Sequence, residues 1–313
     1  MTSGARRVAL IGLGEVGQVL AHDLHRAGSV ELAAWDRLFA VADSEPQRAA
    51  AALTFLAVAS DMTETVRGRS LIISAVTAGE CCAAAGEAAG ALTPGAFYLD
   101  LNSVSPRTRA DAARAIGSAG GRYVEAAVMS PIAPQRLASP IWLGGPHARE
   151  FLPIAQSLGF AGSAVYSDTL GEASAAKMCR SVIVKGMEAL LTESLLTARR
   201  HGVEDAVLAS LEDLFPIRGD WHRLARYMIS RSLQHGHRRA EEMREAARTV
   251  AEAGFEPWMS EGIVARQEWA AGQSSALRAE TLGALLDHML ERTPAADAAQ
   301  EAAAEPAREA ASR

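Results

Sequence analysis

Lysine is almost absent from this chain: of 31 basic residues, only Lys177 and Lys185 are lysines. Both lie in one stretch, GEASAAKMCRSVIVKG, residues 171–186. An arginine stays protonated at any working pH, whereas a lysine can be pushed toward neutrality by burial and can then give and take a proton. The two positions are therefore candidates for proton transfer, although a compositional bias alone would leave the same pattern.

Cysteine and excess positive charge are also lacking. Cys81, Cys82 and Cys179 are odd in number and show no C-x-x-C spacing, so neither a disulfide framework nor a metal site is expected, and the cytoplasm is the default location. The net charge is -6 and no basic patch is interleaved with aromatic residues, which argues against nucleic acid as a partner. The apolar N-terminal run is broken by glycines and Glu15, so it predicts a strand and turn rather than a signal peptide, and no membrane partner is expected.

The apolar runs in the first half predict an alternating α/β domain. The 313 residues, 49% of them hydrophobic, suffice for one large or two medium soluble domains. RVALIG predicts a strand, EVGQVLAHDLHRAG a helix and VELAAWD a second strand. Short apolar runs at 70–76 and 96–101 predict buried parallel strands, and further strands are expected at RYVEAAV, SPIWLGG and GSAVYS.

Strand signals end after Asp168. Helices are predicted over 171–201, 204–215, 219–254 and 259–291, with breaks that include Gly236 and Gly272. Residues 294–313 hold few large apolar side chains and are expected to form a disordered, solvated tail. The expected fold class is therefore α/β plus all-α, with one domain over 1–167 and a second over 168–293.

The motif GLGEVG follows the first strand and opens the first helix. Gly12 permits a tight turn, Gly14 lets the backbone approach a pyrophosphate, and Gly17 lets the helix pack closely on the strand. Asp36 ends the second strand, 19 residues after Gly17, where a carboxylate binds ribose hydroxyls. A glycine turn without a nucleotide is the alternative. The predicted cofactor contacts are Gly12, Leu13, Gly14, Glu15, Val16, Gly17, Asp36, Arg37, Val76 and Thr77.

The end of the second strand also bears on the choice of cofactor. The carboxylate of Asp36 repels a 2′-phosphate, which favours NAD. Arg37 could instead cover a phosphate and stack on adenine, which leaves NADP open.

With the glycine motif, DLNSVSP (100–106) and GEASAAKMCRSVIVKG in this order, the chain resembles the β-hydroxyacid dehydrogenase and 6-phosphogluconate dehydrogenase superfamily over residues 7 to about 290. KMCRSVIVKGMEALLTE and HGHRRAEEM resemble a poorly characterised branch with a C-terminal domain of formerly unknown function. The resemblance implies an N-terminal Rossmann domain, a long helix leaving it, and an all-helical domain that forms a homodimer. It also implies a small, anionic substrate.

In such enzymes a lysine early on the long helix is catalytic, in the pattern G-x-G-x-x-x-K-x-x-x-N. Gly171, Lys177 and Ser181 occupy the corresponding places, with Ala173 where the second glycine stands in the pattern. The substrate-binding segment D-A-P-V-S-G-G corresponds to EAAVMSP (125–131), which lacks both glycines. Hydride transfer is thus implied, but the substrates of the better-known members do not carry over.

The chemistry assigns a role to Lys177. Hydride transfer from an alcohol also requires removal of the hydroxyl proton, and a lysine desolvated in an interdomain cleft could have its pKa lowered toward working pH. Ser181 lies one helical turn further and could orient the substrate oxygen. The predicted substrate contacts are Asn102, Ser103, Ser130, Ser181 and Lys185. Asn102 could alternatively be a helix cap, and Lys185 could form an ion pair, for example with Glu188.

The segment HGHRRAEEM does not predict a metal centre, because His235 and His237 point to different sides of a helix. Arg238 and Arg239 could bind a substrate anion or form a salt-bridged helix face with neighbouring glutamates. The leading function is an NAD(P)-dependent dehydrogenase of a small hydroxy acid. The alternatives are an imine reductase, whose members usually lack the lysine, and a non-catalytic dinucleotide-binding protein.

Overall fold

The computed structural model describes residues 6–28, 30–214, 220–252 and 256–291. The chain divides into two compact units, one of Met1–Arg180 with Arg248–Glu256 and the other of Ser181–Ala247 with Pro257–Arg313. We call them the α/β unit and the helical unit. The expected tail, 294–313, lies outside the described residues, and the domain boundary expected between 167 and 168 remains a prediction.

The α/β unit is built on one eight-stranded sheet with the order β3-β2-β1-β4-β5-β6-β7-β8. All neighbouring strands are parallel except β6 and β7, which are antiparallel. The order reverses between β1 and β4, and ligands of such sheets bind at the carboxyl ends of the strands at this switch point. The strands are β1 (Arg6–Ile11), β2 (Val30–Trp35), β3 (Ala57–Val58), β4 (Leu71–Ser74), β5 (Phe97–Asp100), β6 (Arg122–Val128), β7 (Ile141–Gly144) and β8 (Ser163–Ser167).

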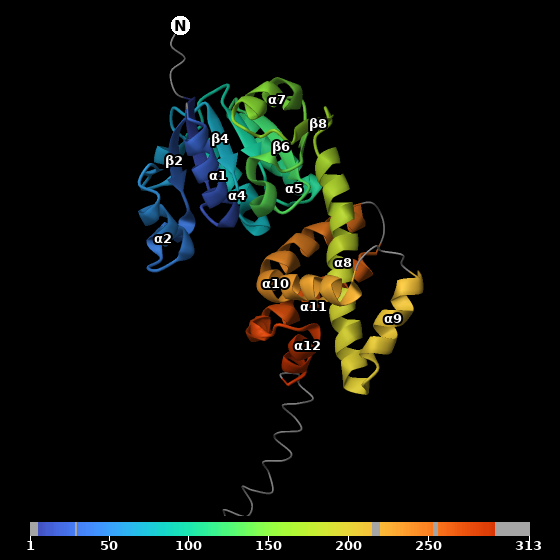
Figure 1. Cartoon of the computed structure of the whole chain (residues 1–313). Helices are drawn as coiled ribbons and strands as arrows, with labels where there is room; N and C mark the ends of the chain where they lie inside the picture. Colours follow the sequence, from blue (N-terminus) through green and yellow to red (C-terminus); the bar gives the residue numbers. More distant parts are fainter. Residues whose placement is uncertain (1–5, 29, 215–219, 253–255, 292–313) are drawn as a thin grey trace, which may run out of the picture. The chain divides into compact units, whose positions relative to one another are not determined.

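Helices cover both faces of this sheet (Figure 1). Along β1, Val8 and Leu10 belong to one hydrophobic core and Ala9 and Ile11 to the other, as the alternation of side chains in a doubly covered strand requires. The first core contains α1 (Glu15–Ala27) and α7 (Ala148–Ser157), and the second contains α3 (Met62–Val66), α4 (Cys81–Ala89) and α5 (Pro106–Ser118). The remaining short elements are α2 (Glu45–Ala52), α6 (Ile132–Gln135), η1 (Arg37–Ala40), η2 (Ala78–Glu80) and η3 (Arg136–Ala138).

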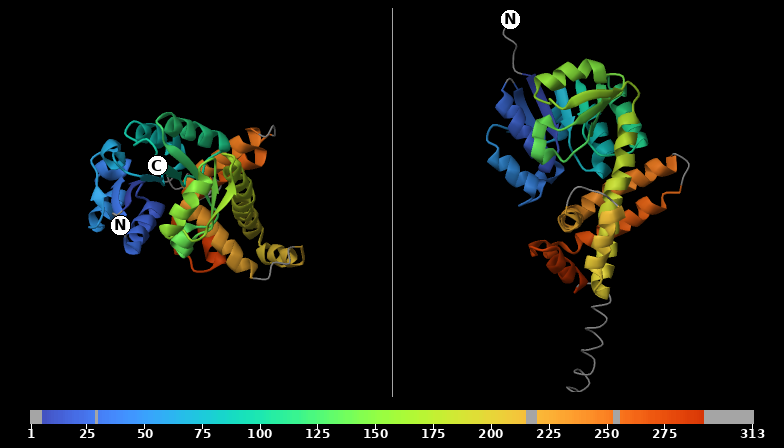
Figure 2. Two further views of the ribbon diagram at one scale, coloured as in Figure 1. Left: turned by 90° about the horizontal axis from the view of Figure 1, so that it is seen from above. Right: turned by 45° about the vertical axis from the view of Figure 1, so that its right-hand side comes forward.

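The second half of the described chain is helical, as predicted. Its elements are α8 (Glu172–His201), α9 (Glu204–Leu214), α10 (Trp221–Glu252), α11 (Trp258–Ala271), η4 (Ser274–Arg278) and α12 (Leu282–Leu290). In the helical unit, α8, α9, α10, α11 and α12 all contribute side chains to one hydrophobic core. Figure 2 shows the ribbons of these helices from two further directions. No helix among the residues placed by the structure is long and apolar enough to cross a membrane.

The break expected at Gly236 is a kink inside α10, where His235 has non-helical dihedral angles. A Cβ atom on Gly236 would lie 2.3 Å from the carbonyl oxygen of Gln267. Only glycine therefore allows α10 and α11 to approach this closely. The long predicted helix 259–291 is divided into α11 and α12 around Gly272, as the sequence indicated.

Candidate functional site

The glycine turn joins β1 to α1 at the switch point of the sheet. Gly12 has a φ of +91°, and a Cβ atom there would lie 2.4 Å from the carbonyl oxygen of Ala75. A Cβ atom on Gly17 would lie 2.1 Å from the carbonyl oxygen of Gly12, whereas one on Gly14 would meet no atom within 4 Å. Gly12 and Gly17 are therefore required by the fold, and Gly14 leaves open space at the amino end of α1. This arrangement fits a dinucleotide pyrophosphate.

Asp36 connects this turn to the end of β2. Its Oδ2 accepts a hydrogen bond from the backbone N–H of Leu13 at 2.8 Å, and its Oδ1 accepts one from the N–H of Leu38 at 2.9 Å. A carboxylate has about four lone-pair positions. The two bonds therefore leave acceptor capacity for ribose hydroxyls, and the predicted ribose contact is compatible with the structure.

Arg37 forms an ion pair with Glu80 of η2. Arg37 follows β2 and Glu80 follows β4, and β1 lies between these strands in the sheet. The pair thus links the loops on either side of the glycine turn. Both side chains are partly exposed, so water screens the attraction between them.

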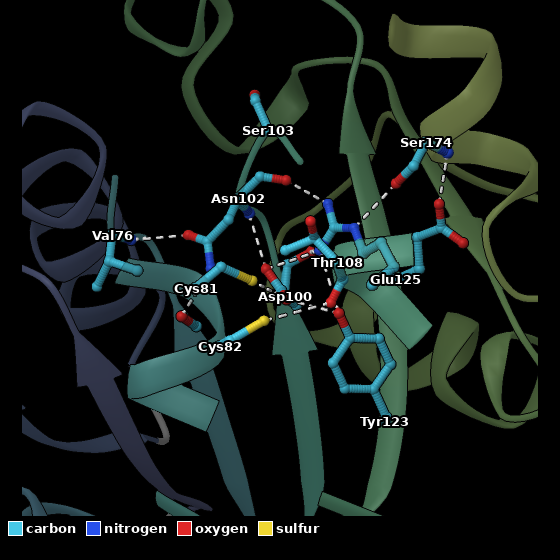
Figure 3. A network of polar contacts seen from close by, with 12 residues as sticks. Val76, Cys81, Cys82, Asp100, Asn102, Ser103, Thr108, Tyr123, Glu125 and Ser174 are labelled. Carbon is cyan, nitrogen blue, oxygen red and sulfur yellow. Dashed lines mark hydrogen bonds and ion pairs between the residues drawn. The ribbon is translucent and has the colours of Figure 1, made fainter. Parts of the chain in front are cut away.

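Asn102 links the loop after β5 to the loop after β4. Its Oδ1 accepts from the N–H of Val76 at 2.8 Å, and its Nδ2 donates to the hydroxyl of Ser74 at 3.0 Å (Figure 3). Only 2% of the residue is exposed. The helix-capping role considered for Asn102 belongs to Ser105, which accepts from the N–H of Thr108. The predicted substrate contact of Asn102 remains a prediction.

Lys177 and Ser103 meet at the same edge of the sheet as the glycine turn. The Nζ of Lys177 donates to the hydroxyl of Ser103 at 2.6 Å, across 74 positions in the sequence. Ser103 follows β5, two strands away from β1, and its side chain points away from the buried contacts around Asn102 (Figure 3). Two residues proposed independently from the sequence are therefore neighbours.

Beneath this pair lies a buried polar network, which the sequence analysis missed. Arg109 and Asp100 are fully buried, and Nη1 of the arginine lies 2.7 Å from Oδ1 of the aspartate. The hydroxyl of Tyr123 donates to Oδ2 of Asp100 at 2.6 Å, and the thiol of Cys81 donates to the same oxygen at 3.3 Å (Figure 3). The network therefore ties α5, the end of β5 and β6 together.

Glu125 of β6 secures the beginning of α8. Its carboxylate accepts hydrogen bonds from the backbone N–H groups of Gly171, at 2.7 Å, and Ser174. These N–H groups at a helix start have no partner within the helix, and a negative charge there is stabilised by the helix dipole. Glu125, which the sequence placed in the substrate-binding segment, thus holds the helix that carries Lys177.

Charges in this network compensate one another. Burial opposes the charge of Arg109, but neighbouring groups outweigh it, Asp100 with the largest effect, so the pKa of Arg109 is raised well above its ordinary value. Burial, and then the charge of Asp100, raise the pKa values of Tyr123 and Cys81 as well. Both groups therefore keep their protons and act as donors to Asp100.

The other predicted substrate residues lie elsewhere. Ser130 follows β6, and its hydroxyl donates to the carbonyl oxygen of Pro131 at 3.2 Å. In the helical unit, Lys185 donates to the hydroxyl of Ser181 at 3.3 Å and forms an ion pair of 2.6 Å with Glu242. The ion pair considered for Lys185 therefore exists with Glu242 rather than Glu188.

The HGHRRAEEM segment forms part of α10. Arg238 pairs with Glu242 at 3.1 Å, and Arg239 pairs with the buried Glu188 of α8. Burial lowers the pKa of Arg239 to about 10. Within the described ranges, no three histidine, cysteine or carboxylate side chains gather as they would around a metal ion. The two arginines are thus engaged by glutamates of the same chain.

Sequence signals for the missed network existed but were indirect. Arg109 lies three and seven positions before the buried residues Ala112 and Ile116, which is the spacing of one helix face. Asp100 ends the buried strand FYLD. A charged residue in each of two buried positions predicts an ion pair, but only the structure shows that the pair reaches α8.

Comparison with known proteins agrees with this geometry. A model of the NAD binding domain of 6-phosphogluconate dehydrogenase matches residues 7–150, and a model of a domain of unknown function, DUF1932, matches residues 198–270. The first of these matches covers the glycine turn, Asp36 and the loops after β4 and β5.

Solved structures extend the similarity over nearly the whole chain. A conserved hypothetical protein from Sinorhizobium meliloti 1021 is 33% identical, with a TM-score of 0.68 over 92% of this chain and 97% of that one. A conserved protein of unknown function, described as structurally similar to 3-hydroxyacid dehydrogenases, is 31% identical, with a TM-score of 0.62 over 85% and 97%. The 3-hydroxyisobutyrate dehydrogenase of Mycobacterium tuberculosis, solved with L-serine, is 17% identical with a TM-score of 0.66 over 92% and 99%, and shows the fold alone. The chain therefore belongs to the 6-phosphogluconate dehydrogenase-like family of NAD(P)-binding, hydroxyacid dehydrogenase-like oxidoreductases, in the branch that carries the C-terminal domain DUF1932.

Proposed function

We propose that the protein transfers a hydride between a nicotinamide cofactor and a small hydroxy acid or its carbonyl counterpart, with Lys177 as general acid and base. The observation that carries the proposal is the hydrogen bond of 2.6 Å between Lys177 and Ser103, at the edge of the sheet that holds the glycine turn. When bound, the nicotinamide supplies the hydride acceptor or donor. The protein must then handle the proton.

Lys177 suits this task because it donates a hydrogen bond to a neutral hydroxyl, that of Ser103. A substrate hydroxyl can take the place of the serine at the ammonium group without separating two opposite charges. In the oxidative direction, Lys177 starts as the neutral amine and its Nζ accepts the proton of the substrate hydroxyl, which gives the ammonium form; in the reductive direction, the ammonium form gives a proton to the carbonyl oxygen. Ser103 then orients the same oxygen.

We favour NAD over NADP. Asp36 places a carboxylate beside the expected ribose position, where it disfavours a 2′-phosphate. Arg37, the residue that would bind such a phosphate, is already paired with Glu80. Titration with each cofactor tests this preference, and tighter binding of NADP would refute it.

The assembly that fits this proposal is a homodimer formed through the helical unit. The apolar residues of α12 that the sequence suggested for this role are packed in the core of the chain itself, among them Leu285 and Met289. On α8, however, Ile183 and Leu190 are 66% and 54% exposed and lie seven positions apart on one helix face. A monomer by light scattering at micromolar concentration would contradict the dimer.

The first experiment is a screen of hydroxy acids and aldehyde acids with NAD and NADP. The absorbance of the reduced nicotinamide reports the reaction. Cyclic imines belong in the same screen, because imine reductases share this architecture. The variant Lys177→Met is then compared with the wild type. Loss of turnover with unchanged cofactor affinity supports the lysine mechanism, and unchanged turnover refutes it. Cofactor binding with no turnover of any compound would favour a non-catalytic role.

A further inference from the structure

A buried arginine that takes no direct part in the proposed chemistry joins the two segments that carry Lys177 and Ser103. Nη2 of Arg109 donates to the carbonyl oxygen of Asn102, the residue before Ser103. Nε of Arg109 donates to the hydroxyl of Ser174 at 2.9 Å. Ser174 lies three positions before Lys177 in α8, so the two residues share a helix face. One guanidinium group therefore holds the backbone beside Ser103 and the helical turn before Lys177.

The position of Arg109 is itself tightly determined. Its Nη1 donates to the carbonyl oxygen of Asp100 at 2.8 Å and lies 2.7 Å from the carboxylate of the same residue. A guanidinium group is planar and holds its five N–H groups in a fixed arrangement. Because the group cannot bend, movement of Ser174 relative to Asn102 would break at least one of these bonds.

The bond between Arg109 and Ser174 does more than the start of α8 requires. The backbone N–H groups of Gly171 and Ser174 already have the carboxylate of Glu125 as an acceptor. The hydroxyl of Ser174 adds a second and differently directed connection, which leads to the loop after β5. This loop is the segment that carries Ser103.

We propose that Arg109 is a positioning residue for proton transfer, which sets the separation of Lys177 and Ser103 through Ser174 and the carbonyl group of Asn102. The inference rests on the proposed function of Lys177. Proton transfer requires heavy-atom separations of about 2.6 to 3.2 Å. A displacement of about 1 Å can reduce a rate about 100-fold, so a rigid connection between the two segments has catalytic value.

The test compares two variants that each remove one hydroxyl group from the network. Ser174→Ala breaks the connection between Arg109 and α8, while the backbone bonds to Glu125 remain. Tyr123→Phe removes a donor to Asp100 and an acceptor of a 3.4 Å hydrogen bond from Nη1 of Arg109, but it keeps the groups that accept from Arg109 at Ser174 and Asn102. Because the chain has only two lysines, labelling lysine with ¹³C at Cε gives one NMR signal for each. Lys185 serves as the internal reference for Lys177.

For Ser174→Ala we expect the Lys177 signal and its titration to change while the Lys185 signal and the affinity for NAD stay as in the wild type. Single-turnover hydride transfer, measured with a substrate from the screen, should fall about 10- to 100-fold. Tyr123→Phe should lower the denaturation midpoint but leave the Lys177 signal unchanged and the rate within about twofold. Wild-type values of signal and rate in Ser174→Ala would overturn the proposal. So would equal changes of the Lys177 signal in both variants.

Failure of the positioning role and failure of the proposed function would give different results. If Lys177→Met turns over at the wild-type rate, Lys177 is not the acid and base, and the proposed mechanism fails. The lysine signals of Ser174→Ala still report in that case whether Arg109 positions Lys177. A changed Lys177 signal would support the positioning role, and an unchanged signal would overturn it.

Discussion

The two lysines of this chain have different surroundings. In the α/β unit, Lys177 is half-buried and donates to the neutral hydroxyl of Ser103 at 2.6 Å. In the helical unit, Lys185 is 13% exposed at its side chain and pairs at 2.6 Å with the carboxylate of Glu242. A substrate oxygen can replace a hydroxyl partner, but replacing a carboxylate requires the separation of two charges in a poorly hydrated place. The comparison supports the proposed role of Lys177 in proton transfer and a structural ion pair for Lys185.

The charged groups near the two lysines also differ, in how far neighbouring charges offset the cost of burial. Arg109, near Lys177, has its pKa raised by Asp100 and Glu125 in spite of burial. Near Lys185, burial lowers the pKa of Arg239, and it also lowers the pKa of Lys185 against the opposing effect of Glu242. Arg109 is therefore well compensated, whereas Arg239 and Lys185 are incompletely compensated. Burial of a titratable group alone does not identify its role.

The largest expected effect separates the two lysines by replacing each with arginine. Lys177→Arg keeps the charge but cannot release a proton, so hydride transfer should fall about 10²- to 10⁴-fold, or about 3 to 5 kcal/mol of transition-state stabilisation. Lys185→Arg keeps a cation beside Glu242 and should stay within about threefold of the wild type. Single-turnover kinetics across pH measures both. A Lys177→Arg variant with most of the wild-type rate would reverse the assignment.

A smaller effect is expected when the partner of each lysine is removed. Glu242→Gln leaves Lys185 without its carboxylate and should lower the free energy of unfolding by about 2 to 4 kcal/mol. Ser103→Ala removes a neutral partner from a half-buried lysine and should cost about 1 kcal/mol or less. Urea denaturation of both variants gives the two values. The comparison fails if Ser103→Ala is the more destabilising change.

The pH dependence of stability should reveal the lowered pKa of Lys185. Because its pKa in the folded chain lies below the ordinary value of 10.5, the unfolded chain binds more protons between these two pH values. The free energy of unfolding should therefore rise with pH in this window, by at most about 1.4 kcal/mol per pH unit. In Lys185→Met this contribution should be absent, and in Glu242→Gln the rise should begin at lower pH. Denaturation curves at several alkaline pH values measure this dependence. If the free energy of unfolding of Lys185→Met rose with pH as steeply as that of the wild type, the expectation would be contradicted.

The smallest effect concerns Arg37, a cation in an exposed ion pair. Glu80→Gln frees the guanidinium group from its partner, so the affinity for NADP should rise about 3- to 5-fold while that for NAD stays nearly constant, since an exposed pair contributes about 1 kcal/mol or less. Isothermal titration calorimetry measures both affinities. Arg37→Gln in the same background should remove the gain. Weaker NADP binding by Glu80→Gln would show that the pair supports the phosphate site instead.

Local patterns account for what could be predicted. The glycine turn needs only a strand, a tight turn and a helix, and each of these is specified within a few neighbouring residues. Lys177 and Ser103 were predicted separately as site residues, but their contact spans 74 positions and depends on the first turns of α8 lying beside the loop after β5. Arg109 escaped prediction because an arginine on a helix is usually exposed, and its partners come from three separate segments, namely residues 100–102, β6 and α8.

The sequence by itself determined the order of the main strands and helices, though not the short strand β3, together with the glycine turn and the position of both lysines on one long helix, because hydrophobic periodicity and backbone sterics act over short distances. The tertiary structure alone decided which charges meet. Glu188 lies three positions from Lys185, the spacing of neighbours on a helix, yet it pairs with Arg239, and Lys185 pairs with Glu242. Both partners lie on α10, and the reason is that a buried charge must be matched by whichever opposite charge the packed neighbouring helix brings within reach.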